Sequence, residues 1–274
     1  MGNGKLRRWA FLLPLAIVGA LYSAALAQPS VTELRAIAQR DGEDVDAWIN
    51  LGNAYLAEER FGLAKEAFLE AVALDYTGGD AHFGLGLAEF GRGDLDAALF
   101  AFNEVTRLHP ERFDGHYNRG VTLSRLDRPA DAAEAFRAAI DQSEPEAQAQ
   151  ELIDAYVGLA SQLTRSGNPA GAAEAYASAA QLVEEDSAAA RDLNFMEAQA
   201  LYRAGRGLEA LPALTELEGS GADERVSALI SDIYLEQGQV DYALRTLERG
   251  VRRAQEAGDG RLEASLLGNL GLLE

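Results

Sequence analysis

Small and aromatic residues recur along this chain with a period of 34 residues in its first half. Within each repeat a small residue is followed by an alanine twelve positions later, and by an aromatic residue or leucine sixteen positions later. In the first repeat these three residues are Gly52, Ala64 and Phe68. A period of this length predicts stacked units of two antiparallel helices, because one helical hairpin cannot bury its apolar face alone.

The small residues have a packing role in this interpretation. The first helix carries one at the same position of every repeat, at Gly52, Gly86, Gly120, Ala160, Ala198, Ser231 and Gly271. The second helix carries alanine at Ala64, Ala98, Ala132, Ala172, Ala210 and Ala243. Small side chains let two helices approach closely. We expect the aromatic residues of the second helices to fill the space between one repeat and the next.

Applied along the chain, the pattern predicts six full repeats within residues 45–260. They cover residues 45–78, 79–112, 113–146, 153–186, 191–223 and 224–257. Residues 28–44 contain a capping box, from Ser30 to Glu33, which predicts an N-terminal helix that covers the first repeat. Residues 261–274 restart the motif and predict a partial repeat with a C-terminal helix. Gly93, Gly167, Gly205 and Gly238 are expected to be left-handed residues between paired helices.

Composition agrees with an all-α fold, because helix-favouring alanine, leucine, glutamate and arginine dominate. The formal charge of −20 comes from 44 acidic and 24 basic residues, and this balance repels nucleic acid. The chain has no cysteine, which excludes disulfides, thiolate nucleophiles and cysteine-ligated zinc.

Residues 1–27 differ in kind from the rest. Lys5, Arg7 and Arg8 precede an apolar stretch, and Ala25 and Ala27 fit a small-x-small cleavage site before Gln28. This arrangement predicts a secretory signal peptide. The alternative is an uncleaved anchor through residues 9–27, whose apolar length approaches that of a membrane-spanning helix. Both interpretations place the body of the protein outside the cytoplasm, in the periplasm or secreted, and a membrane is a partner only if the segment is retained.

Trp48, Leu51-Gly52, Tyr55, Ala64 and Phe68, together with Pro110 closing the second repeat, form a pattern that resembles the tetratricopeptide repeat family. The exported position marks it as resembling the bacterial members. The resemblance implies a right-handed α-α superhelix of about six helical hairpins with terminal capping helices. It also implies a non-enzymatic role, in which the first helices line a concave groove that binds extended or helical segments of other proteins.

Transferring the groove positions of the family to this chain gives a set of candidate binding residues. They are Asn50, Asn53, Phe83, Phe90, Tyr117, Asn118, Arg125, Arg165, Phe195, Tyr202 and Arg203. We expect the aromatic members to be exposed anchors, since packing between helices does not require them. The three arginines share one repeat position and predict a basic stripe for an acidic or carboxylate-bearing segment. The alternative is that each arginine only complements the dipole of its helix.

Some family members grip a C-terminal carboxylate with lysine and asparagine. Asn53 and Asn118 match the asparagine positions, but Ile49 occupies the lysine position, so we expect this clamp to be absent.

The sequence offers no catalytic grouping, no cofactor motif and no metal site. His82 and His116 lie one period apart at the position of Trp48, without a third ligand at suitable spacing, so we interpret them as packing residues. The leading hypothesis is a protein-binding adaptor in the bacterial cell envelope. The alternative is a structural subunit of an envelope assembly machine for a pilus, secretion or outer-membrane biogenesis.

Overall fold

A computed structural model describes residues 29–143, 149–185, 187–219 and 224–271. The chain divides into two compact units, Met1–Gly158 and Leu159–Glu274, called unit 1 and unit 2 below. Every regular element within the described residues is an α-helix, which confirms the predicted all-α fold. The predicted signal segment, residues 1–27, lies outside the described residues.

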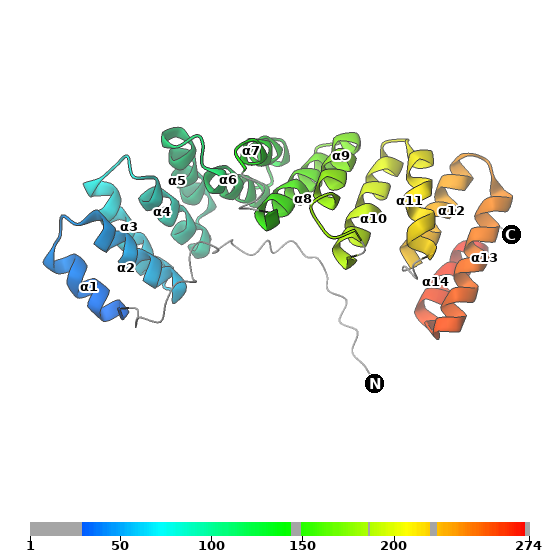
Figure 1. Cartoon of the computed structure of the whole chain (residues 1–274), viewed down its shortest axis with the longest axis horizontal. Coiled ribbons are helices and arrows are strands. Elements are labelled where there is room, and N and C mark those ends of the chain that lie inside the picture. Colours follow the sequence, from blue (N-terminus) through cyan, green and yellow to red (C-terminus); the bar gives the residue numbers. More distant parts are fainter. Residues whose placement is uncertain (1–28, 144–148, 186, 220–223, 272–274) are drawn as a thin grey trace. The chain divides into compact units, whose positions relative to one another are not determined.

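Unit 1 is a row of helices in which each packs against the next (Figure 1). Its helices are α1 (Val31–Arg40), α2 (Val45–Ala57), α3 (Phe61–Leu74), α4 (Gly79–Arg92), α5 (Leu95–Leu108), α6 (Phe113–Arg125), α7 (Pro129–Asp141) and the first part of α8 (Ala149–Arg165). The first helices of the first two repeats, α2 and α4, also contact each other. First helices therefore form one layer and second helices the other.

Unit 2 repeats this arrangement with helices of less uniform length, from 12 residues in α9 to 18 in α13. It contains the last part of α8, α9 (Pro169–Ala180), α10 (Ala188–Arg203), α11 (Gly207–Gly219), α12 (Glu224–Glu236), α13 (Val240–Ala257) and α14 (Gly260–Gly271). The helix α10 contacts α9, α11 and α12, and α14 packs on α13 and α12. Leu266 of α14 is buried against Leu247 and Val251 of α13, so the last helix covers the final hairpin.

The helix α1 begins with the capping box that the sequence predicts. The Ser30 hydroxyl accepts a hydrogen bond from the Glu33 amide at 3.3 Å, and the Glu33 carboxylate accepts one from the Ser30 amide at 2.8 Å. Ala38 of α1 is fully buried in the cluster formed by α2, α3 and α4. The Arg35 side chain donates to the Tyr55 hydroxyl of α2. The helix α1 thus covers the first repeat.

Each of the three hairpins of unit 1 closes around a fully buried phenylalanine from its second helix, Phe68, Phe102 or Phe136. Phe68 of α3 lies between Gly52 of α2 and Gly84 of α4: a β-carbon added at Gly52 would be 2.7 Å from the Phe68 ring, and one at Gly84 would be closer still. Phe136 of α7 is enclosed in the same way by Gly120 and Gly158. The predicted filling of the space between repeats by aromatic rings is confirmed.

The turn between the two helices of each hairpin contains a residue in the left-handed region. Gly93, Gly167, Gly205 and Gly238 have φ between 70° and 81°, which confirms their predicted role. Glu59 and Asp127, one period before and after Gly93, adopt the same conformation with φ of 55° and 58°. Residues with a β-carbon are strained in this region, so the conformations of Glu59 and Asp127 lower the stability of the folded state.

We expect Gly52→Ala to destabilise the protein by about 1–3 kcal/mol, because the new methyl group overlaps a ring that is enclosed on all sides. Thermal or urea unfolding measures the change. Gly62→Ala is the matched control, since a β-carbon at this exposed helical position meets nothing within 4 Å. Equal unfolding free energies for the two variants would contradict the role assigned to Gly52.

We expect Glu59→Gly to stabilise the protein by about 1 kcal/mol, because glycine adopts the left-handed region without steric cost. Gly93→Ala is the reciprocal change one period later, where the added β-carbon meets nothing within 4 Å, and it should destabilise by a similar amount. Chemical denaturation compares both variants with the parent chain. Shifts of the same sign in the two variants would show that the turn conformation is not the cause.

Candidate protein-binding surface

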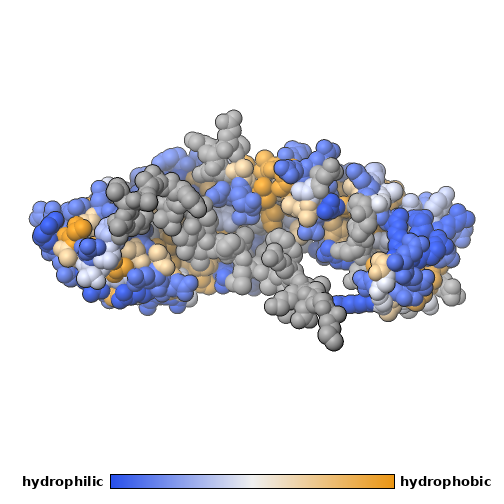
Figure 2. All heavy atoms as spheres, turned by 60° about the horizontal axis from the view of Figure 1, so that its bottom comes forward, coloured by the Kyte–Doolittle hydropathy of each residue, from blue (hydrophilic) through white to orange (hydrophobic). Residues whose placement is uncertain are grey.

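Four of the candidate residues lie on the first helices α2 and α4 of unit 1. Asn50 and Asn53 are exposed on α2, while Phe83 and Phe90 are half-buried on α4. All four residues thus lie on first helices, and the two helices contact each other. Hydrophilic residues cover most of the described surface in Figure 2, and hydrophobic residues appear there as separate patches.

A guanidinium group lies over each phenylalanine of α4. The central carbon of Arg112 is 5.3 Å from the centre of the Phe83 ring, and that of Arg125 is 5.4 Å from the centre of Phe90. Cations are attracted to aromatic faces at these distances. The sequence pattern did not identify Arg112 as a ring partner, because it precedes α6 and lies outside the repeat positions used.

The two arginines differ in their other contacts. Arg112 is fixed by Asp80 and Asp114, each 2.6 Å away, and these bonds raise the pKa of Arg112 above its usual range. Arg125 is exposed and has no carboxylate partner within the described residues. The positive charge of Arg112 is therefore paired with carboxylates of the fold. The positive charge of Arg125 lies beside an apolar ring, where a ligand can pair with it.

Tyr117 and Asn118 are not exposed, which corrects the expectation from sequence. Tyr117 has 3% of its surface exposed, stacks on Phe113 at 5.7 Å and meets the edge of Phe136 at 5.8 Å. Its burial raises the pKa of the Tyr117 hydroxyl. Asn118 is also buried, and its amide donates to the Asp114 carbonyl of its own helix at 2.9 Å. Both residues are therefore part of the packing and hydrogen bonding within the third repeat, formed by α6 and α7.

Unit 2 holds the remaining aromatic candidates. Phe195 of α10 is buried, again contrary to the expected exposure, and the Arg225 guanidinium lies 4.8 Å from its ring centre. Tyr202 is partly buried, and its hydroxyl hydrogen-bonds the Glu236 carboxylate of α12. Burial and this carboxylate raise the pKa of Tyr202 to about 12. These two rings contribute mainly to the contact between α10 and α12.

The three candidate arginines are exposed as expected. Arg125, Arg165 and Arg203 each lie in the last turn of a first helix, so the helix-dipole explanation applies to all three. The Arg165 guanidinium also donates to the Gln162 side chain at 2.8 Å. Because Arg125 lies in unit 1 and the other two in unit 2, each unit presents its part of the predicted stripe separately.

The ring nitrogens of Trp48, His82 and His116 have a common structural role. Each contacts the backbone carbonyl six residues earlier, at Gly42, Tyr76 and Pro110, with distances of 3.2, 2.8 and 2.9 Å. The contact ties the loop between repeats to the helix that follows. No group of three possible metal ligands is found among the described residues. In the sequence, this hydrogen bond corresponds to the recurrence of tryptophan or histidine, whose rings carry nitrogen atoms, at one repeat position.

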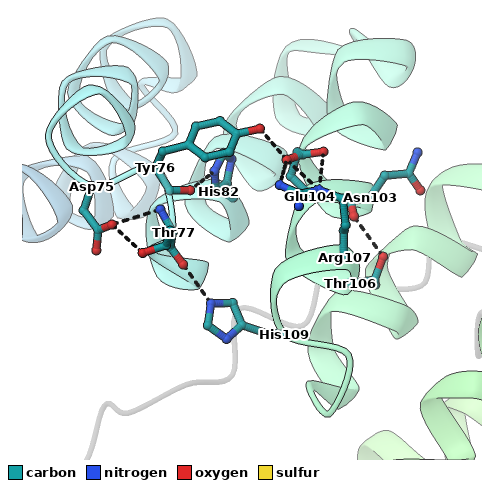
Figure 3. Close-up of polar contacts among 9 residues, drawn as sticks. All are labelled: Asp75, Tyr76, Thr77, His82, Asn103, Glu104, Thr106, Arg107 and His109. Carbon is teal, nitrogen blue, oxygen red and sulfur yellow. Dashed lines mark hydrogen bonds and ion pairs between the residues drawn. The ribbon is translucent and has the colours of Figure 1, made fainter.

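The loop between the first two repeats is held by a further polar network (Figure 3). The Tyr76 hydroxyl donates to the Glu104 carboxylate of α5 at 2.5 Å, and Arg107 bonds the same carboxylate at 2.7 Å. The Arg107 and Tyr76 bonds lower the pKa of Glu104 to about 2. The His109 ring reaches the Thr77 carbonyl at 2.9 Å. A carboxylate held ionised in this way stabilises the loop and is unsuited to exchanging protons near neutral pH.

Residues 49–112 and 83–147 match the family model described as tetratricopeptide repeat. Residues 49–147 therefore contain tetratricopeptide repeats. Comparison of this repeat protein with curated protein sequences gives no match.

Solved structures share its fold. YrrB, described as a TPR protein with an unusual peptide-binding site, has a TM-score of 0.57 at 16% identity, covering 77% of this chain and 100% of its own. MamA has a TM-score of 0.51 at 22% identity, covering 56% and 85%. PilF of Pseudomonas aeruginosa has a TM-score of 0.51 at 18% identity, covering 84% and 99%. At these identities the likeness shows the fold alone.

Within the part of the chain that the structure describes, no helix has the length and apolar character needed to cross a membrane.

We expect Tyr117→Ala to destabilise the repeat protein by about 3 kcal/mol, because it removes a buried ring from between two others. Asn53→Ala, an exposed candidate of the same unit, should leave stability nearly unchanged. Urea unfolding followed by circular dichroism distinguishes the two. A Tyr117→Ala chain as stable as Asn53→Ala would mean that Tyr117 is not a packing residue.

Proposed function

We propose that this repeat protein is a non-enzymatic scaffold whose first-helix layer in unit 1 binds a segment of another protein. The bound segment presents a carboxylate next to an apolar side chain. The proposal rests on one observation, the exposed Arg125 guanidinium over the Phe90 ring without a carboxylate partner in the described residues. A charged donor beside an apolar surface favours a ligand with both features.

The surroundings of Arg125 make this pairing specific. Several other arginines of unit 1 pair with nearby carboxylates, as Arg92 does with Glu89 at 2.5 Å and Arg128 with Asp131 at 2.6 Å. The chain as a whole carries a charge of −20, so an acidic ligand is repelled at long range. Attraction is then confined to the immediate neighbourhood of Arg125, where Phe90 adds apolar contact. Asn50 and Asn53 supply exposed amides that can bond the main chain of a bound segment.

We also propose that the protein acts outside the cytoplasm, in the cell envelope. Support comes from the basic head, apolar stretch and small-x-small site of residues 1–27. Export would deliver the scaffold to envelope proteins as partners. A chain expressed with its native N-terminus should be recovered from the periplasm with Gln28 as its first residue if the segment is cleaved.

A fixed subunit of an envelope assembly machine is the second candidate. It is favoured by large apolar side chains exposed on second helices, away from the first-helix layer. Phe100 of α5 is 65% exposed and Leu69 of α3 is 44% exposed. A stoichiometric complex that survives purification, and that Phe100→Ser disrupts while Arg125→Ser does not, would favour this role over a scaffold that binds segments transiently.

The experiment is a binding survey with immobilised random twelve-residue peptides and the purified protein. We expect enrichment of peptides that combine aspartate or glutamate with an apolar residue. Arg125→Ser should weaken binding of the selected peptides about tenfold, roughly 1.4 kcal/mol, without changing the melting temperature.

Arg137→Ser is the matched control, because Arg137 is exposed on α7, a second helix, and its replacement alters the net charge equally. Fluorescence anisotropy with a labelled peptide gives the affinities. Equal losses in both variants would assign the effect to net charge, and no loss in Arg125→Ser would remove Arg125 from the site.

A further inference from the structure

A surface cavity of about 520 Å³ lies between α9 and α10 in unit 2. Its walls include Ala177 and Ala180 of α9, Gln181 and Glu185 of the loop that follows, and Asn194 and Glu197 of α10. The volume is in the range of small-molecule and side-chain binding pockets. The walls combine methyl groups with two carboxylates and two amides.

The repeat pattern explains why the cavity exists. Asn194 occupies the position of Trp48, His82 and His116, four residues before the small residue of the first helix. Glu197 occupies the position of Leu51 and Leu85, one residue before it. In the fifth repeat both bulky groups are thus replaced by smaller or polar side chains, while α9 presents only alanine methyl groups opposite. The first two repeats have a ring and a leucine at these positions, whereas the fifth repeat has a cavity beside them.

The carboxylate of Glu197 has no cation as a partner in the part of the chain that the structure describes. Among the described residues no hydrogen bond or ion pair is formed by its carboxylate, and its partial burial raises the pKa of the group. Removing a carboxylate from water without a partner is unfavourable. A leucine at this position would serve packing better, so the carboxylate has no structural benefit that the fold reveals.

In the sixth repeat, a carboxylate near the equivalent position of the first helix has arginine partners. There Ser227 occupies the ring position, and the buried Glu218 carboxylate lies 3.2 Å from its hydroxyl. Arg253 of α13 reaches this carboxylate at 3.7 Å and donates to the Glu218 carbonyl at 2.6 Å, while Arg249 lies 3.5 Å from the carboxylate. In the sixth repeat the chain supplies its own guanidinium groups, whereas no ion pair to Glu197 is found among the described residues.

We propose that the cavity between α9 and α10 binds an arginine side chain of a partner protein, with Glu197 as its carboxylate partner. The guanidinium fork pairs with the Glu197 carboxylate and with the amide oxygens of Asn194 or Gln181. The aliphatic stem of the arginine lies against the methyl groups of Ala177 and Ala180. This site is separate from the surface around Arg125, whose ligand has the opposite charge, and the two can be tested independently.

The test uses the full-length protein and Nα-acetyl-arginine N-methylamide, which carries no charge other than its guanidinium. Proton-nitrogen NMR spectra follow the side-chain amide of Asn194 during titration. We expect saturable shifts with millimolar affinity, and a fall in the pKa of Glu197 measured by carbon-detected titration, because a bound cation favours the ionised form. Nα-acetyl-citrulline N-methylamide, the uncharged analogue of nearly equal shape, should bind at least tenfold more weakly.

Variants make the assignment specific. Glu197→Gln should lower the affinity for the arginine probe at least fivefold while preserving cavity shape, and Glu216→Gln, an exposed change on α11, should leave it unchanged. Glu197→Leu, which restores the residue of the first two repeats, should abolish binding and raise the melting temperature.

The stability that Glu197→Leu adds should depend on pH in a definite direction. The folded-state pKa of Glu197 is raised, so ionisation disfavours the folded state, and the advantage of leucine should grow as the pH rises from 4 to 7.

Two results would overturn the proposal: equal binding of the arginine and citrulline probes, or unchanged arginine binding in Glu197→Gln. The first would leave an apolar cavity without charge recognition, and the second would place the cation elsewhere. Neither result bears on peptide binding at Arg125, and Arg125→Ser should bind the arginine probe as the parent chain does. Failure of this inference is therefore distinguishable from failure of the proposed scaffold function.

Discussion

The contact between a second-helix phenylalanine and the glycines of the two first helices beside it is the interaction on which unit 1 depends. A helix surface with no side chain at one position allows the ring to reach the backbone, and the ring then joins two hairpins that would each expose apolar surface alone. The stability of each hairpin consequently depends on its packing against the adjacent hairpins. Because every first helix is held at a fixed distance by this contact, its outward face can present polar and aromatic groups in a regular row without contributing to the core.

Much of the fold follows from the sequence because the packing positions are periodic. The small residues, the enclosed rings, the left-handed turn glycines and the Ser30 capping box all obey local or repeating rules, and a rule repeated several times is easily recognised. The repeat bounds in unit 2 are harder to read, since loop lengths vary there and small residues other than glycine occupy the close-contact position.

The candidate site was less predictable because exposure depends on neighbours outside the repeat pattern. Tyr117 and Phe90 both occupy first-helix positions outside the repeat motif, yet Phe113 and Phe136 cover Tyr117 while Phe90 stays half-exposed. Arginine has the same ambiguity: Arg112 and Arg125 each cover a ring, but only the three-dimensional placement of Asp80 and Asp114 shows which of them is neutralised. Individual neighbouring side chains decide whether a ring is covered and whether a guanidinium is neutralised, and the repeat period does not specify these neighbours.

The ring nitrogens of Trp48, His82 and His116 impose a further constraint on the chain. Each requires a carbonyl at a set number of residues upstream, so adding or deleting a single residue between loop and helix would break the bond and misplace the ring. The first three repeats share one period, whereas the fifth and sixth, where Asn194 and Ser227 replace the ring, depart from it. Insertions and deletions should therefore be tolerated during divergence in the later repeats, while the early ones can change length only by gaining or losing an entire hairpin.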